Sequence, residues 1–239
     1  ESDYPLGNLR ELMAAYEAVP VEGLPAFHGG AVGYMSYDHV RFFERLPDKN
    51  PDPLNLPDLY FMVTDTILIF DHAKNRLLIV SNAHVKDNPD AAYSEAARKI
   101  EAIEAKLRRP LVVATERLHS APEGQEVRSN FTRERFCEAV EQCKEYIRAG
   151  DVFQVVLSQR FERNVYASAT NLYRALRCIN PSPYMTLVQY PEFTLVGASP
   201  EVMTRVEGRT VMVRPIAGTR RRGANAAEDA ALAEELIHD

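Results

Sequence analysis

Short β-rich runs that follow one another across tight turns constrain the fold of this chain more than any other feature. Residues 59–70 and 76–81 are rich in β-branched and aromatic residues, and the polar segment 71–75 joins them into a hairpin. Further runs lie at 184–190 and 193–198, followed by a hairpin that pairs 202–206 with 209–216 around Glu207 and Gly208. Because consecutive hairpins pair antiparallel, the sequence predicts an α+β fold of largely antiparallel sheets flanked by helices, not a doubly wound parallel sheet.

Helical spacing of apolar residues predicts the helices that accompany these strands, at 1–20, 90–109, 132–150, 168–179 and 226–236. Thr132 is the expected N-cap of the third helix, and Gly150 its expected left-handed C-terminal residue. A strand that begins after two glycines is expected at 28–37, and a loop over 38–57. Residues 152–163 alternate between apolar and polar, which predicts a strand with Gln154 on its polar face.

The helical and strand periodicity is lost over 110–130, where Ser, Pro, Gly and Glu become frequent. This change predicts a linker over 111–130 between an N-terminal lobe at 1–110 and a second lobe at 131–239. A chain of 239 residues is long enough for a substantial buried core.

Composition excludes several classes of partner. Acidic residues outnumber basic ones by 34 to 28, a formal net charge of -6, which argues against nucleic acid as a partner. No apolar run approaches the roughly 18 residues of a membrane span, and no leader is recognisable, so we expect a cytoplasmic protein that binds no membrane. The six histidines are scattered and are expected to be structural, without a metal site. The odd set of cysteines predicts reduced core thiols at Cys137, Cys143 and Cys178.

Two segments near the C-terminus carry residues that packing alone does not require. In Gly-Ala-Ser-Pro-Glu at 197–201, Glu201 follows a proline and is expected to open a strand, at the end of a sheet. It is either an acid placed for chemistry or an exposed glutamate at a strand start. In Pro-Ile-Ala-Gly-Thr at 215–219, Gly218, Thr219 and the arginines that follow favour either a turn that holds a carboxylate or a solvated basic loop.

Four motifs, taken in their order along the chain, resemble those of a known enzyme family. Asp-Val-Phe-Gln-Val-Val-Leu-Ser at 151–158, Asn-Pro-Ser-Pro-Tyr-Met at 180–185 and the two segments above resemble the chorismate-utilising enzymes, and among them the anthranilate synthase component I group. Gly-Gly-Ala-Val-Gly-Tyr at 29–34 also resembles a segment of that family, so the resemblance covers nearly the whole chain. It implies the α/β sandwich of the family, with 131–239 as the first part of the chorismate-binding domain.

Single residue types separate the relatives within this family. Isochorismate and salicylate synthases carry a lysine, taken as the base that activates water, where this chain has Gln154, and a neutral amide cannot act as that base. Aminodeoxychorismate synthases typically carry a nucleophilic lysine where this chain has Ala217. The resemblance therefore implies a lyase of tryptophan biosynthesis that converts chorismate and ammonia to anthranilate and pyruvate. The ammonia would come from glutamine through a separate glutamine amidotransferase subunit.

The resemblance also implies roles for individual residues. Glu201 matches the glutamate that protonates the departing ring hydroxyl, Gly218 and Thr219 match the chorismate-binding pair, and Gln154 is expected to line the same pocket. The segment that binds tryptophan as feedback inhibitor is matched by Asn180, Pro183, Tyr184 and Met185.

No residue of this chain matches the family's Mg²⁺ ligands, which are expected beyond Asp239, so we expect the 239 residues alone to be inactive. Two alternatives remain open: an aminodeoxychorismate synthase component I that tolerates alanine at 217, and a non-catalytic domain that binds tryptophan as a regulator.

Overall fold

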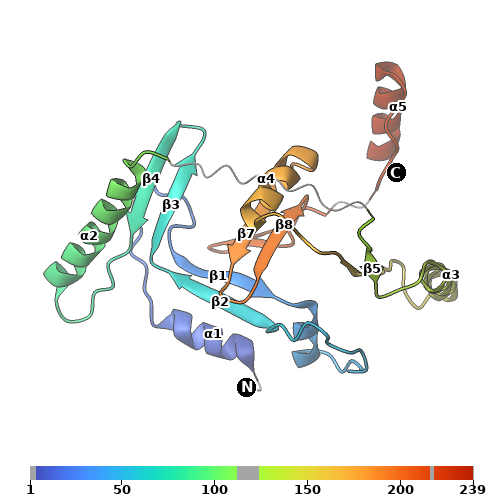
Figure 1. Ribbon diagram of the computed structural model, residues 1–239, viewed down its shortest axis with the longest axis horizontal. Helices are drawn as coiled ribbons and strands as arrows, with labels where there is room; N and C mark the ends of the chain where they lie inside the picture. Colours follow the sequence, from blue (N-terminus) through green and yellow to red (C-terminus); the bar gives the residue numbers. More distant parts are fainter. Residues whose placement is uncertain (1–3, 112–123, 216–217, 239) are drawn as a thin grey trace. The chain divides into compact units, whose positions relative to one another are not determined.

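The computed structural model describes residues 4–111, 124–215 and 218–238 (Figure 1). The chain divides into two compact units, Glu1–Val113 with Val206–Thr210, and Ala114–Arg205 with Val211–Asp239.

Two antiparallel strand pairs form the sheets of the first unit. Strand β1 pairs with β2, and β3 pairs with β4, in the hairpin predicted around residues 71–75. The predicted run 59–70 is thus two strands, because Asp65 interrupts it and its carbonyl oxygen accepts a hydrogen bond from Asn82 N–H at 2.8 Å. The strands are β1 (Gly30–Met35), β2 (Leu59–Thr64), β3 (Thr66–Asp71) and β4 (Arg76–Ser81).

Helix α2 (Pro89–Leu107) packs beside β4 in the first unit, where Figure 1 shows it next to the β3–β4 hairpin. Its N-cap Asn88 accepts a hydrogen bond from Ala91 N–H at 3.1 Å. Lys99 on this helix lies 2.6 Å from the Asp65 carboxylate, and its hydrogen bond lowers the pKa of Asp65. This ion pair joins the helix to the break between β2 and β3.

Two shorter helices complete the first unit. Helix α1 (Pro5–Ala14) lies within the predicted range 1–20. The predicted loop 38–57 is partly wrong, because Tyr37–Phe42 forms a 3₁₀ helix that Figure 1 leaves unlabelled. His39 in this turn is only 1% exposed and lies between the rings of Phe42 and Phe43. Burial of the His39 ring against these two exposed rings favours the compact turn, and the prolines and charges of the segment give no sign of it.

Helices α3 and α4 of the second unit begin and end where local signals predict. Helix α3 (Arg133–Ala149) has Thr132 as its N-cap, whose hydroxyl accepts from Arg135 N–H at 3.3 Å, and it ends at Gly150, which has a left-handed φ of 82°. Helix α4 (Ala169–Ile179) starts after Ser168 and packs on the antiparallel pair of β7 (Tyr184–Gln189) and β8 (Thr194–Ser199) (Figure 1). The predicted elements at 168–179, 184–190 and 193–198 are confirmed.

The predicted strand 152–163 is wrong over most of its length. Only β6 (Phe161–Glu162) is a strand, and it pairs with β5 (Arg128–Ser129) across two residues. Residues 152–160 have no regular structure, and the Phe153 and Val156 side chains are 92% and 85% exposed. Alternation states which side chains could share a face, but a strand also needs a neighbour to pair with, and here the pairing stops after two residues.

The remaining elements are shorter than, or differ from, the expected ones. The predicted hairpin 202–216 contains β9 (Arg205–Glu207) and β10 (Thr210–Met212), and α5 (Ala226–Ile237) matches the predicted C-terminal helix. The predicted linker 111–130 contains β5 at its end, and its residues 112–123 lie outside the described part.

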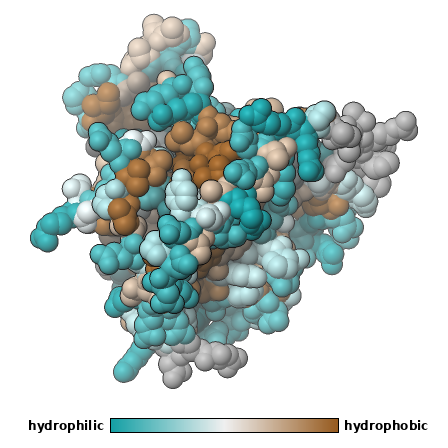
Figure 2. Space-filling view, turned by 90° about the vertical axis from the view of Figure 1, so that its left-hand side faces the viewer, coloured by the Kyte–Doolittle hydropathy of each residue, from teal (hydrophilic) through white to brown (hydrophobic). Residues whose placement is uncertain are grey.

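Few apolar side chains are buried. Among the described hydrophobic residues only Ala96 and Tyr190 are buried. Apolar patches, brown in Figure 2, remain at the surface. The buried core in the described residues is therefore smaller than the substantial core expected from the chain length. Cys137 and Cys178 are exposed, so their prediction as core thiols is wrong. Of the described helices, none combines the length and apolar character that a membrane span requires.

Candidate active site

Strands β7 and β8 bring two of the predicted functional segments together. In the antiparallel register, Tyr184 lies opposite Ser199 and Met185 lies opposite Ala198. The segment expected to bind tryptophan and the segment that carries Glu201 therefore meet at the same end of this strand pair. The hairpin turn between the two strands lies at the other end of the pair, and its register sets which residues of the two segments lie opposite each other.

Glu201 lies in a bend after β8, not at the start of a strand as predicted, because the next strand begins only at Arg205. Glu201 is partly buried, and its backbone carbonyl oxygen accepts a hydrogen bond from the Ser199 hydroxyl at 3.0 Å. This hydrogen bond spans Pro200 and fixes the bend. The prediction that the glutamate lies at the end of a sheet is confirmed by this placement.

The expected tryptophan segment runs from the end of α4 into β7. Asn180 ends the helix, and its N–H donates to Leu176 O at 2.8 Å. Pro183 and Tyr184 are exposed, whereas Met185 is partly buried. A helix end and a strand start thus hold the four residues within one short connection.

Gly218 and Thr219 lie in a segment without regular structure that precedes α5. Arg220 follows them, and its guanidinium donates to Thr219 O at 3.2 Å and to the Glu235 carboxylate at 2.8 Å. The carbonyl of Thr219 is therefore tied through one side chain to the last turn of α5. The juxtaposition of Glu201 with Gly218 and Thr219 remains a prediction.

The arginines after Thr219 pair with acidic side chains of the protein itself, and carboxylate binding by this turn stays a prediction. Arg221 donates to Glu228 at 2.5 Å, and Arg222 forms two hydrogen bonds to Asp229, at 2.9 and 2.5 Å. Both acids lie in the first turn of α5, where negative charge is favoured by the helix dipole. Local sequence shows the basic cluster but not the acids that neutralise it, because these lie 7 or more residues further on.

The electrostatic effect of this pairing is largest at Asp229. Hydrogen bonds from the Arg222 guanidinium and from Gly223 N–H lower the pKa of Asp229 from its ordinary 3.8 to about 2. The carboxylate is therefore ionised throughout the neutral range.

Gln154 lies in irregular chain and is exposed, so its placement on the polar face of a strand is wrong. Ala217, whose residue type separates the relatives, lies outside the described residues. Within 4–111, 124–215 and 218–238, no three His, Cys, Asp or Glu side chains gather closely enough to hold a metal ion.

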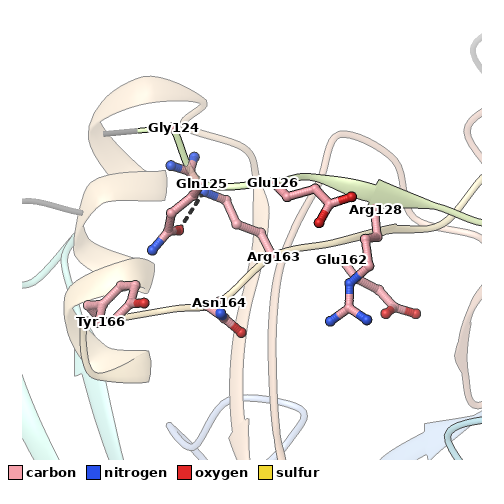
Figure 3. A pocket seen from close by; sticks show the side chains of 8 residues that line it. All are labelled: Gly124, Gln125, Glu126, Arg128, Glu162, Arg163, Asn164 and Tyr166. Carbon is pink, nitrogen blue, oxygen red and sulfur yellow. Dashed lines mark hydrogen bonds between the residues drawn. The ribbon is translucent and has the colours of Figure 1, made fainter. Parts of the chain in front are cut away.

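A polar pocket of about 350 Å³ beside β5 and β6 was not predicted (Figure 3). Arg163 donates to Gln125 Oε1 at 3.0 Å, drawn as a dashed line, and Gln125 Nε2 is buried without a partner among the described residues. Arg128 and Tyr166 also line it. No sequence pattern indicated this pocket, because its residues come from two segments more than 30 residues apart.

Comparison with known proteins agrees with the resemblance. The family model for chorismate binding enzymes matches residues 2–239. Anthranilate synthase component 1 from Aquifex aeolicus is 38% identical over 239 residues, covering 100% of this chain and 48% of that protein. The protein of the same name from Thermus thermophilus is 46% identical over 234 residues, covering 95% of this chain and 48% of that protein.

A solved structure shows the same similarity in three dimensions. The crystal structure of anthranilate synthase component I from Streptococcus pneumoniae TIGR4 matches with a TM-score of 0.81 and 30% sequence identity, over 99% of this chain and 50% of that one. The predicted class of helices with antiparallel strands is thereby confirmed. The chain spans about half the length of the relatives it matches. With its whole described length matched by the family model, the chain belongs to the chorismate binding enzyme family.

Proposed function

We propose that residues 1–239 are part of an anthranilate synthase component I, a cytoplasmic lyase of tryptophan biosynthesis. The observation that carries this proposal is the 38% to 46% identity with proteins of that name along nearly the whole chain. In the proposed reaction, ammonia adds to the ring of chorismate and the ring hydroxyl departs as water. The enolpyruvyl side chain then leaves as pyruvate, and anthranilate is the aromatic product.

Two residue types support ammonia as the incoming group. Gln154 is an amide with no useful proton affinity near pH 7, so it cannot activate water as a lysine would. Ala217 offers no side-chain nucleophile that could attack the ring in place of ammonia. A partner glutamine amidotransferase subunit would release the ammonia from glutamine.

The roles proposed for this chain's residues follow from the resemblance of their motifs to the family. Glu201, in the bend after β8, would donate the proton to the leaving hydroxyl, a contribution usually worth about 10²–10⁴ in rate. Gly218 and Thr219 would bind chorismate, with Gln154 lining the same pocket. Tryptophan would inhibit at Asn180, Pro183, Tyr184 and Met185, and the family's Mg²⁺ would be held by residues outside this chain.

The proposal is tested by product analysis with the complete component I that contains residues 1–239. Supplied with chorismate, ammonium and Mg²⁺, it should produce anthranilate, detected by fluorescence and identified by mass. Formation of aminodeoxychorismate, or of no product, would contradict the proposal. The isolated 239-residue chain should give no anthranilate under the same conditions, because it spans about half the length of the relatives it matches.

A further inference from the structure

Segment 218–224 is attached to α5 by a ladder of three ion pairs. Arg220 pairs with Glu235, Arg221 with Glu228, and Arg222 with Asp229, at 2.8, 2.5 and 2.5 Å. The ladder therefore reaches from the first turn of the helix to its last.

Backbone contacts reinforce the ladder at the start of α5. Gly223 N–H donates to Asp229 and Ala224 N–H donates to Glu228, each at 2.8 Å, while Asn225 caps the helix. A Cβ atom on Gly223 would lie 2.6 Å from Asp229 Cα, so a larger residue does not fit at this approach. Charge-assisted hydrogen bonds of this kind are stronger than neutral ones.

The ladder is the main attachment of α5 in the described part of the chain. No other described helix or strand packs extensively against it. Helix α5 and segment 218–224 therefore hold each other in place, and the Arg220 guanidinium contacts both the Thr219 carbonyl and the Glu235 carboxylate.

We propose that Glu235 and Asp229 are positioning residues for the chorismate-binding pair Gly218 and Thr219, acting through Arg220 and Arg222. This inference rests on the proposed function, because a fixed orientation of Thr219 matters only if Thr219 binds chorismate. Glu235 holds the guanidinium that orients the Thr219 carbonyl. Asp229 anchors the other end of the segment. Neither acid contacts the substrate.

The first test measures the ladder itself by limited trypsin digestion of the 239-residue chain. Trypsin must take an arginine side chain into its specificity pocket, so an arginine engaged in an ion pair is protected. Glu235→Gln and Asp229→Asn should accelerate cleavage after residues 220–222 about fivefold, identified by peptide mass. The matched control Glu234→Gln lies on the same helix but pairs with His238, and should stay within about twofold of wild type. Equal cleavage rates in all four proteins would contradict the claim that these ion pairs hold the arginines at 220–222.

The second test measures positioning by steady-state kinetics of the complete component I. Glu235→Gln should raise KM for chorismate about three- to tenfold with kcat within about twofold, while Glu235→Asp, which keeps the charge, should restore part of the affinity. Faster trypsin cleavage with an unchanged KM would overturn the positioning role and leave the proposed function intact. A wild-type protein that turns over no chorismate would overturn the proposed function and this role together, and the trypsin result would still report on the ladder.

Discussion

Substitution of Gly33 by alanine tests the packing of β1 against β2. Gly33 lies opposite Phe61 in the antiparallel register. A Cβ atom on Gly33 would lie 2.7 Å from Phe61 Cα and even closer to the carbonyl oxygen of Tyr60. Both are backbone atoms of the paired strand, so no side-chain rotation can relieve the clash. The two strands would have to separate.

The expected cost follows from these contacts. Overpacking by one methyl group costs about 1–3 kcal/mol where the neighbouring atoms cannot move away. Each hydrogen bond between β1 and β2 that opens adds about 1 kcal/mol. We therefore expect Gly33→Ala to lower the free energy of unfolding of the first unit by about 3 kcal/mol.

Urea unfolding followed by circular dichroism, together with amide hydrogen exchange of β1 and β2, measures this loss. Gly197→Ala is the matched control, since a Cβ there would meet the Thr186 hydroxyl at 2.8 Å, a side-chain atom that can turn away. It should cost about 1 kcal/mol, and less in a Thr186→Ala background. A Gly33→Ala protein within roughly 0.5 kcal/mol of wild type, the scatter of such measurements, would show that the approach of β1 to β2 at Gly33 leaves room for a methyl group.

Two further predictions concern helix ends. Thr132→Ala removes the hydroxyl that caps α3 and should cost about 1 kcal/mol in urea unfolding, whereas Thr132→Ser should stay near wild type; equal losses in both would contradict a capping role. Because the pKa of Asp229 is lowered from 3.8 to about 2 in the folded state, its bond to Arg222 stabilises α5 above about pH 4. That stabilisation should be lost as the pH falls from about 4 towards 2. NMR titration of the Asp229 carboxyl should show this change. The NMR signals of α5 in Asp229→Asn should not show it. A carboxyl that titrates near 3.8 would contradict it.

Features that depend on neighbours in the sequence could be predicted. The N-cap at Thr132 and the left-handed glycine at Gly150 act within one helical turn, and both are found where expected. The β7–β8 hairpin is equally local, since its strands are separated by four residues. The same register then places the Tyr184 and Ser199 segments together, so part of the candidate site follows from the hairpin.

Features that depend on distant partners could not be predicted. The alternation after Val152 gave no sign that only two residues would find a partner strand, in β5. The ion pairs of the arginines after Thr219 were not predicted, because the acids that pair with them belong to a separate helix. Apolar residues were expected in a core, but a periodic pattern identifies an apolar face without identifying what covers it.

The glycine-rich segment 29–34 lies between these two cases. Its similarity to the family was visible in the sequence, but the reason for Gly33 was not. Only the paired strand shows that the carbonyl of Tyr60 occupies the space that a side chain would need.

The kcat of Glu201→Gln in the complete component I measures most directly whether Glu201 is the proton donor. The substitution keeps the shape of the side chain and removes its acidic proton. We predict that kcat for anthranilate formation falls about 10²–10⁴-fold while KM for chorismate changes little, because the proton reaches the departing hydroxyl only in the transition state. A kcat within about threefold of wild type would show that Glu201 is not the acid that protonates the departing hydroxyl.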